Sequence, residues 1–279
     1  MSKLRCSVIG VGYLGRFHAQ KYAKIPGVEL RGVFDVSIEN ARAVALELGI
    51  EVFEDLNTLV QQTDAVSIAA STPAHYDLAK FCLEHGVHVL LEKPMTQHLH
   101  QALDLIHCAK ANGVVLQIGH LERFNPAYQA FLPYIQQPIL IEMQRLAPFK
   151  KRGSEVDVIL DLMIHDLDIL LSMVKSPIRE IKAKGFSMMT PSIDFASVSI
   201  TFENTCVAHL TASRVHSHAE RLTRVYQEKD YYVLNYQEQQ LTCYKPNPDA
   251  SDHSFLTQEI LTSETKDALY EQILSLIHI

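Results

Sequence analysis

A glycine-rich turn near the start of the chain limits the fold more than any other feature of the sequence. Leu4 to Ile9 has an apolar strand pattern, and it leads into the G-x-G-x-x-G of Gly10 to Gly15. The residues from Arg16 to Lys24 then have helical composition. In such a turn the first glycine permits the bend, the second lets the backbone approach a diphosphate, and the third lets helix and strand pack closely. The pattern predicts a nucleotide-binding strand–turn–helix unit.

A second strand pattern ends at an acidic residue. Val28 to Val33 is mostly apolar, and Asp35 follows it, about 20 residues beyond the last glycine, as in dinucleotide-binding folds. A carboxylate there accepts hydrogen bonds from ribose hydroxyls and repels a 2′-phosphate, so we expect NAD rather than NADP. Asp35 could also cap the helix expected over Ser37 to Leu48, and the two roles are compatible.

Strand and helix patterns alternate up to residue 119. We expect helices over Asp55–Gln62, Pro73–His85 and His98–Ala111, and strands over Ala65–Ala69, Val87–Leu91 and Val114–Gly119. Alternation with short connections predicts a parallel, doubly wound sheet of the α/β Rossmann class. We place this domain at residues 1–122.

Polar residues follow two of these strands, at the edge where open parallel sheets bind ligands. Glu92 and Lys93 precede Pro94 directly after a buried strand pattern, and Lys93 is the first candidate for the chemistry. The turn of Ser71, Thr72 and Pro73 follows a neighbouring strand. It could line the nicotinamide side of a cofactor, or it could be an ordinary helix N-cap.

The pattern changes after Pro126. One amphipathic helix is expected over Val156–Val174, and strands are expected over Ile139–Leu146, Ile178–Gly185, Phe195–Phe202, Cys206–Ser213, Leu222–Gln227 and Tyr231–Tyr236. Successive strands without helices predict an antiparallel sheet. We therefore expect residues 123–279 to form an α+β domain with a mostly antiparallel sheet.

The helix expected from Val156 carries a carboxylate and an imidazole. Asp161 and His165 are related as i and i+4, which puts them on one face, about 6 Å apart along the helix axis. The pair could serve proton transfer, or it could be an interior histidine bonded to an aspartate one turn away. Asp166 and Asp168 are expected to be solvent-facing or structural.

Other polar groups suggest weaker sites. Arg123 and Asn125 follow a strand end and could bind sugar or diphosphate oxygens, since guanidinium suits phosphate. The basic run at residues 150–152 is either a solvated loop or a further diphosphate contact. His216 and His218 would share one strand face, but no third ligand is evident. We therefore expect no metal centre.

Composition narrows the class of protein. Of the 279 residues, 47% are hydrophobic, and the net charge of -7 disfavours a nucleic-acid partner, because nucleic acids attract basic surfaces. The five cysteines are scattered without a C-x-x-C, which is typical of reduced thiols in a cytoplasmic protein. We find neither a signal-peptide pattern nor an apolar run long enough to span a bilayer.

Four motifs together resemble the Gfo/Idh/MocA family of NAD(P)-dependent sugar and polyol dehydrogenases. They are Gly10–Gly15, Ser71-Thr72-Pro73-Ala74-His75, Glu92-Lys93-Pro94 and Asp161-Leu162-Met163-Ile164-His165. The resemblance covers roughly the whole chain. It implies that Lys93, Asp161 and His165 line the active site and that the Lys93–Pro94 peptide is cis. It also implies that the C-terminal sheet carries a dimer or tetramer contact.

Three further segments resemble the branch of this family that acts on UDP-N-acetylglucosamine. They are Gly119–Ala127, Arg145–Phe149 and Asp161–Asp168. The resemblance implies oxidation of the sugar's 3-hydroxyl, with the 3-keto product passing to an aminotransferase on the route to the 2,3-diamino sugars of lipid A. The alternatives are another sugar or inositol dehydrogenase of the family and an NAD-binding sensor without catalysis.

These inferences assign residues to three roles. Lys93, His165 and Asp161 are the expected catalytic residues, with either Lys93 or His165 as the base. Lys93, Arg123, Asn125, Asp161 and His165 are expected to contact the substrate. The cofactor is expected to contact Gly10, Gly12, Tyr13, Leu14, Gly15, Asp35, Ser71, Thr72, Pro73, His75, Glu92 and Lys93. Family members commonly continue past the apolar helical pattern of residues 275–279, so we also expect that a truncated chain would leave part of the nucleotide domain uncovered.

Overall fold

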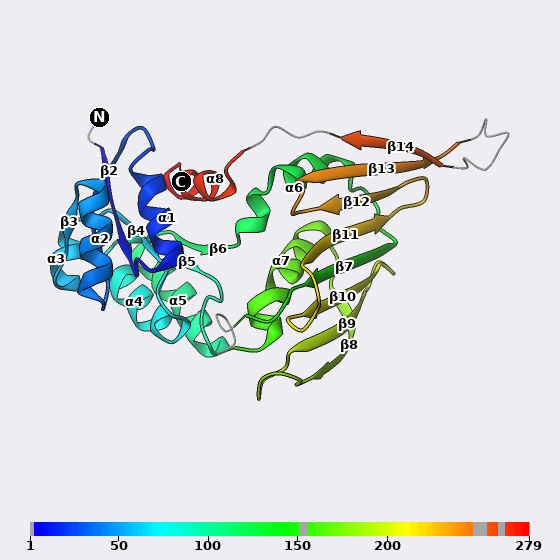
Figure 1. Ribbon diagram of the computed structural model, residues 1–279, viewed down its shortest axis with the longest axis horizontal. Helices are drawn as coiled ribbons and strands as arrows, with labels where there is room; N and C mark the ends of the chain where they lie inside the picture. Colours follow the sequence, from blue (N-terminus) through cyan, green and yellow to red (C-terminus); the bar gives the residue numbers. More distant parts are fainter. Residues whose placement is uncertain (1–2, 151–155, 248–255, 262–265, 279) are drawn as a thin grey trace. The chain divides into compact units, whose positions relative to one another are not determined.

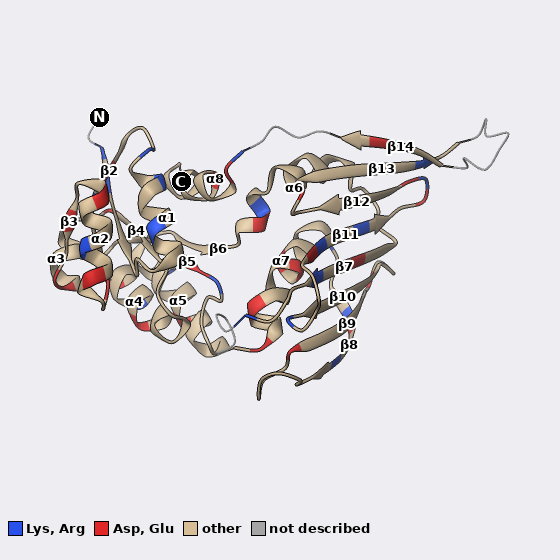
Figure 2. Cartoon of the chain, in the orientation of Figure 1, with Lys and Arg blue, Asp and Glu red and all other residues tan. Residues whose placement is uncertain are grey.

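The computed structural model describes residues 3–150, 156–247, 256–261 and 266–278. The chain divides into two compact units, Met1–Leu121 together with Asp267–Ile279, and Glu122–Lys266. Figure 2 shows acidic and basic residues distributed over both units. Among the described residues, no helix has the length and apolar character needed to cross a membrane.

The first unit contains a six-stranded parallel sheet (Figure 1). Its strands are β1 (Leu4–Ile9), β2 (Val28–Phe34), β3 (Glu51–Val52), β4 (Ala65–Ile68), β5 (His88–Glu92) and β6 (Leu116–Gly119). Their order in the sheet is β3-β2-β1-β4-β5-β6. Successive strands are added on one side of β1 up to β3 and on its other side from β4 onward. In open α/β folds, ligands bind at such a switch point, which here lies between β1 and β4. The predicted doubly wound sheet is confirmed.

Helices cover both faces of this sheet. They are α1 (Tyr13–Tyr22), α2 (Ile38–Leu48), α3 (Leu56–Gln61), α4 (Thr72–Glu84), α5 (Leu99–Asn112) and α8 (Ala268–Ile277). Because side chains alternate across a strand, Val8 and Leu90 pack in the core with α1, α2 and α8. Ile9 and Leu91 pack in the opposite core with α3, α4 and α5. The sheet is therefore buried on both sides.

The C-terminal helix α8 belongs to the first unit, although the sequence analysis grouped it with the second domain. Its Ile273 and Leu276 are buried in the same core as α1 and α2. Asp267 caps the helix by accepting the Tyr270 N–H, and it also pairs with Lys21 of α1. The packing of Ile273 and Leu276 against α1 and α2 therefore places α8 in the first unit. The order of the elements along the chain does not reveal this packing.

The second unit contains an eight-stranded sheet in the order β14-β13-β12-β11-β7-β10-β9-β8 (Figure 1). Its strands are β7 (Leu140–Leu146), β8 (Ile178–Phe186), β9 (Phe195–Phe202), β10 (Val207–Ser213), β11 (Glu220–Tyr226), β12 (Tyr231–Asn235), β13 (Gln240–Pro246) and β14 (Leu256–Leu261). All neighbours are antiparallel except β7 and β10. The expected mostly antiparallel sheet is confirmed, and β13 and β14 were missed.

One face of this sheet packs against helices. These are α6 (Pro126–Phe131), the π-helix η3 (Ile159–Met163) and α7 (Ile164–Met173). The sequence predicted a single helix from Val156 to Val174. The structure instead starts with a wide π turn and continues as an α-helix. A π turn often marks a functional site.

Candidate active site

The glycine turn has the geometry of a diphosphate cradle. Gly10 has φ +81, and a Cβ built on it would lie 2.6 Å from the Ala70 nitrogen. A Cβ on Gly15 would lie 1.8 Å from the Gly10 carbonyl oxygen, so helix α1 packs directly on the turn. A Cβ on Gly12 would meet nothing within 4 Å. Two glycines are thus required by the protein itself, and the third leaves open space beside the backbone, which fits a dinucleotide phosphate.

Asp35 fastens the end of β2 to this turn. Its Oδ2 accepts the Val11 N–H at 2.6 Å, and its Oδ1 accepts the Ser37 N–H at 2.8 Å. The N-cap of α2 is Ser37, whose hydroxyl accepts the Asn40 N–H. Helix capping, the alternative role for Asp35, therefore belongs to Ser37. The Asp35 carboxylate itself is half-buried at the carboxyl edge of the sheet.

In the turn after β4, Ser71 and Pro73 are exposed and His75 is buried. Ser71 is the N-cap residue of α4 but its hydroxyl makes no capping bond, and Pro73 lies in the first turn. His75 is buried, with Nδ1 2.8 Å from the Pro94 carbonyl oxygen and Nε2 3.0 Å from that of Ala70. His75 therefore joins the turn after β4 to the turn after β5.

Lys93 lies directly after β5, and its peptide bond to Pro94 is cis, as the resemblance implied. The preceding carboxylate of Glu92 is buried, and its Oε2 accepts the Lys93 N–H at 3.3 Å. Its Oε1 lies 3.2 Å from Nε2 of His18, which is fully buried on α1. A Cβ on Gly119 would lie 2.6 Å from this carboxylate, so the glycine leaves room for the carboxylate in its present position.

His18 was missed by the sequence analysis. It stands on the inner face of α1, one turn after the glycine turn. The helical spacing of the residues on this face could have shown it in the sequence. Gly15, His18, Ala19 and Tyr22 are spaced as i, i+3, i+4 and i+7, and they form the buried stripe of α1. The charged group nearest to this buried imidazole is the Glu92 carboxylate, at ion-pair distance.

Asp161 and His165 lie on consecutive helical segments of the second unit. Asp161 is in the π-helix η3, and His165 is in the first turn of α7. The Asp157 carboxylate starts the segment by accepting the N–H groups of Ile159 and Leu160, at 3.0 and 2.9 Å. Both candidate residues are half-buried. The simple i, i+4 geometry of a regular α-helix does not apply, because a π turn holds more residues per turn.

Arg123 and Asn125 are occupied within the second unit. The Arg123 guanidinium donates to both carboxylate oxygens of Asp168, at 2.7 and 2.6 Å. The Asn125 side chain is buried and caps α6 by accepting the Ala127 N–H. Arg123 remains half-exposed, so its guanidinium can also meet a ligand.

A buried ion network anchors α7 to the sheet. Arg145 of β7 donates from Nε and Nη2 to Asp166 at 2.9 and 2.7 Å, and from Nη1 to Glu122 at 2.9 Å. Burial alone would lower the pKa of Arg145, but the two carboxylates raise it above its ordinary value. The guanidinium also lies 5.6 Å from the centre of the Tyr236 ring. Asp166 is thus structural, one of the two roles expected for it.

The remaining sequence candidates are the basic run at residues 150–152 and the pair His216 and His218. Lys151 and Arg152 lie outside the described residues, and Lys150 is exposed. His216 contacts His218, with Nδ1 3.2 Å from its carbonyl oxygen and ring centres 4.5 Å apart. The structure thus places Lys93 and the nucleotide turn in the first unit, and Asp161, His165, Arg123 and Asn125 in the second.

Comparisons with known proteins agree with this organisation. Residues 4–120 match the oxidoreductase family with an NAD-binding Rossmann fold, and residues 137–233 match the GFO/IDH/MocA C-terminal domain. The chain is 41% identical over 249 residues to UDP-N-acetylglucosamine 3-dehydrogenase from Acidithiobacillus ferrooxidans, covering 88% of this chain and 78% of that protein. A solved structure of that enzyme matches with a TM-score of 0.91 and 38% identity, covering 100% of this chain and 89% of the other.

A more distant relative acts on a free polyol. The chain is 30% identical over 231 residues to scyllo-inositol 2-dehydrogenase (NAD(+)) from Bacillus subtilis, covering 76% of this chain and 68% of that protein. The glycine cradle, the two-unit fold and these matches lead to one assignment. The chain belongs to the Gfo/Idh/MocA family of NAD-binding oxidoreductases.

Proposed function

We propose that this protein is an NAD-dependent dehydrogenase that oxidises the 3-hydroxyl of UDP-N-acetylglucosamine to a 3-keto sugar. The observation that carries the proposal is the 41% identity over 88% of the chain to an enzyme of that name. The product's ketone would suit a following aminotransferase, as in the formation of 2,3-diamino sugars for lipid A. We propose a cytoplasmic location, in keeping with the free cysteines.

The cofactor side of the proposal rests on the first unit. The open space beside Gly12 and the N-terminus of α1 suit the phosphates of NAD. Asp35 suits ribose hydroxyls and opposes a 2′-phosphate, and the adjacent Val36 side chain, 98% exposed, suits the apolar face of adenine. Tyr13, Leu14, Ser71, Thr72 and Pro73 complete our proposed contacts. His75 and Glu92 would shape the site, since their polar atoms face protein groups.

Bound NAD would supply the hydride acceptor. In our scheme neutral His165 takes the proton of the sugar hydroxyl, and Asp161 orients the imidazole. Lys93 donates a hydrogen bond to the oxygen as it becomes negative, which stabilises the charge that develops. The scheme with Lys93 as base and His165 as donor is the variant form, because a lysine can also act as a base when its environment lowers its pKa.

The substrate side rests on Arg123. Its side chain is 51% exposed. Its Nε and Nη2 donate to Asp168 and fix the plane of the guanidinium, and Nη1 would be the donor to a phosphate oxygen. We propose that it binds the diphosphate of the nucleotide sugar. Asn125 would act by fixing the start of α6 next to it.

We also propose a homo-oligomer formed through the open face of the second sheet. Tyr226, Tyr231 and Tyr244 alternate with core residues, so they lie on the face opposite α6 and α7. Their rings stack, with centres 5.3 and 4.4 Å apart. Stacked half-buried aromatic rings are typical of interface cores. Sedimentation of the purified protein would test this.

The function is tested by incubating the protein with NAD and UDP-N-acetylglucosamine and following NADH, with a 3-aminotransferase present to remove the product. We expect NADH with this sugar and not with free inositol or glucose. We expect Lys93→Met and His165→Ala each to lower kcat at least about 100-fold, the lower end of general acid–base contributions. Full turnover by Lys93→Met would overturn the scheme.

Two alternatives have distinct outcomes in the same assay. Turnover of inositol instead of the nucleotide sugar would favour the activity of the Bacillus subtilis relative, which shares 30% identity. Binding of NAD without turnover of any alcohol would favour a sensor.

A further inference from the structure

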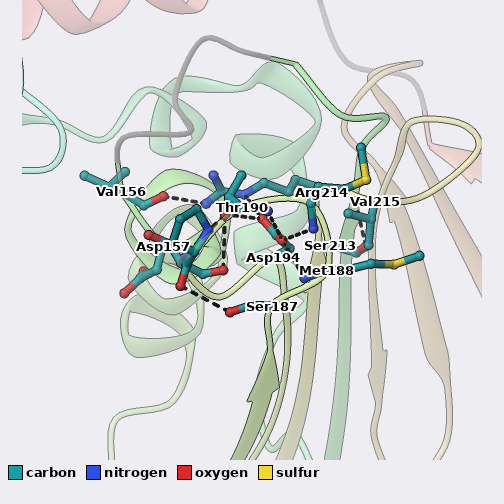
Figure 3. Close-up of polar contacts among 12 residues, drawn as sticks. Val156, Asp157, Ser187, Met188, Thr190, Asp194, Ser213, Arg214 and Val215 are labelled. Carbon is teal, nitrogen blue, oxygen red and sulfur yellow. Dashed lines mark hydrogen bonds and ion pairs between the residues drawn. The ribbon is translucent and has the colours of Figure 1, made fainter.

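A buried carboxylate and a buried guanidinium stand next to the segment that carries Asp161 and His165 (Figure 3). Asp194 precedes β9 and is fully buried, and Arg214 follows β10 and is 3% exposed. Neither residue has a place in the catalytic scheme. Isolated buried charges are costly, so their partners indicate what the pair holds in place.

Asp194 organises the loop between β8 and β9. Its Oδ2 accepts the N–H groups of Met188, Met189 and Thr190, at 2.8, 2.6 and 2.9 Å. Its Oδ1 accepts the Thr190 hydroxyl at 2.7 Å. Burial alone would raise the pKa of Asp194, but these hydrogen bonds hold it well below its usual range. The carboxylate therefore stays charged.

Arg214 connects this charge to the catalytic segment. Its Nε lies 3.7 Å from Asp194 Oδ1, and its backbone N–H donates to the Asp194 carbonyl at 3.0 Å. Its Nη2 donates to the Val156 carbonyl at 2.7 Å. A second bond fastens the same stretch, because the Val158 N–H donates to the Ile193 carbonyl at 2.9 Å.

This attachment lies immediately before the π turn. Val158 is fully buried, and the next residue, Ile159, begins η3. A π turn contains one residue more than an α turn. If the start of the segment were released, relaxation to α geometry would rotate one side of the turn relative to the other by about 100°, the angle per residue of an α-helix. Asp161 lies within the turn and His165 just after it, so their relative direction depends on the fixed start.

We propose that Asp194 and Arg214 form a clamp that fixes the start of the π-helical segment and thereby positions Asp161 and His165 for the reaction. Both are positioning residues, since they act through the segment and not on the substrate. The proposal rests on the function proposed above. It adds two residues, from the ends of two other strands, whose effect on catalysis is indirect.

The test compares Arg214→Met with the milder Arg214→Lys and with Val225→Ala. Val225 is a fully buried core residue of β11, which is separated from β10 by β7, so its truncation lowers stability without touching the clamp. We expect kcat to fall about 10- to 100-fold in Arg214→Met, the cost of slight misplacement of catalytic groups. Arg214→Lys should lose less, and Val225→Ala should keep the kcat of the parent protein.

Two further readouts separate positioning from stability. The KM for NAD should stay within about twofold in Arg214→Met, because NAD-binding residues belong to the other unit. The pH midpoint of the acid limb of the kcat–pH profile should change in Arg214→Met and should stay the same in Val225→Ala. If Arg214→Met has the kcat and pH profile of Val225→Ala, the positioning role is overturned.

Hydrogen exchange tests the clamp without any turnover. We expect the amides of residues 159–165 to exchange at least about tenfold faster in Arg214→Met than in Val225→Ala, because the segment opens locally once its anchor is lost. Equal exchange would overturn the clamp even in an active enzyme. If the parent protein does not turn over the nucleotide sugar, but the two variants still differ in exchange, the proposed function is overturned and the clamp is supported.

Discussion

Backbone atoms hold the candidate site in the first unit, whereas buried ion pairs hold it in the second. Around the nucleotide turn, Asp35 accepts the Val11 N–H, and Gly15 packs against the Gly10 carbonyl. Around α7, Arg145 and Asp166 connect the helix to the sheet through charged side chains. Glycine and backbone geometry can be read from a short motif. Ion pairs depend on partners that only folding brings together, so the second mode is hidden in the sequence.

The largest expected effect comes from glycines of the first unit. Gly15→Ala places a Cβ on the Gly10 carbonyl, so we expect it to lower the free energy of unfolding by more than about 4 kcal/mol, among the most severe single substitutions. Gly12→Ala meets no protein atom within 4 Å. It should leave stability within about 1 kcal/mol and weaken NAD binding at least about tenfold, since the Cβ enters the phosphate space. Urea unfolding and NAD titration measure both quantities.

Equal losses of stability in the two variants would contradict the conclusion that Gly15 is required for packing and Gly12 for ligand binding.

The next effect tests the ion network of the second unit. Arg145→Met leaves the buried Asp166 carboxylate without its cation and removes the nearer of two cations from the part-buried Glu122. We expect a loss of about 4 kcal/mol in the free energy of unfolding. Adding Asp166→Leu should recover part of this loss, because the remaining network then contains one carboxylate fewer. Urea unfolding of the single and double variants measures the difference. A double variant less stable than Arg145→Met would show that the unpaired charge of Asp166 is not what destabilises the single variant.

The stabilisation that the Asp194 carboxylate gives to the second unit depends on pH. Because its folded pKa lies below the ordinary value, its stabilisation is present above the unfolded pKa of about 3.9 and is lost as pH falls toward the folded pKa. Asp194→Asn should therefore lower the free energy of unfolding by about 3 kcal/mol at neutral pH, and the gap to the parent should narrow below about pH 4. Urea unfolding across a pH series measures the gap. A gap that widens on acidification would contradict the assignment.

The smallest effect concerns a buried ionic contact in the first unit, between His18 and Glu92. His18→Leu removes the imidazole that lies 3.2 Å from the buried Glu92 carboxylate, so we expect a loss of about 2 kcal/mol, within the range for a buried polar group that loses a partner. His18→Gln, which keeps a side-chain donor, should lose less. Thermal unfolding of both variants, of Glu92→Gln and of the double variant His18→Leu/Glu92→Gln completes the cycle. Additive losses for His18→Leu and Glu92→Gln would show that the two residues do not interact.

Much of the fold was predictable because its signals are local. The strand β9 was predicted with its observed bounds, Phe195–Phe202, since alternating polar and apolar residues report one buried face. The π turn at Ile159–Met163 was not predictable, because its apolar pattern also suits a regular helix. Strand β13 was missed because Gln240, Lys245 and Pro246 interrupt its apolar pattern.

The sequence by itself determined the glycine turn, the alternation of strands and helices, and the motifs around Lys93 and His165. Each depends on residues close together in the chain, where backbone sterics and side-chain periodicity act directly. Only the tertiary structure decided that Glu92 meets His18, that Asp166 meets Arg145, and that α8 joins the first unit. These contacts join distant residues, such as Gln117 and Gln272 with a separation of 155, and buried polar groups take whichever partner the packed core places beside them.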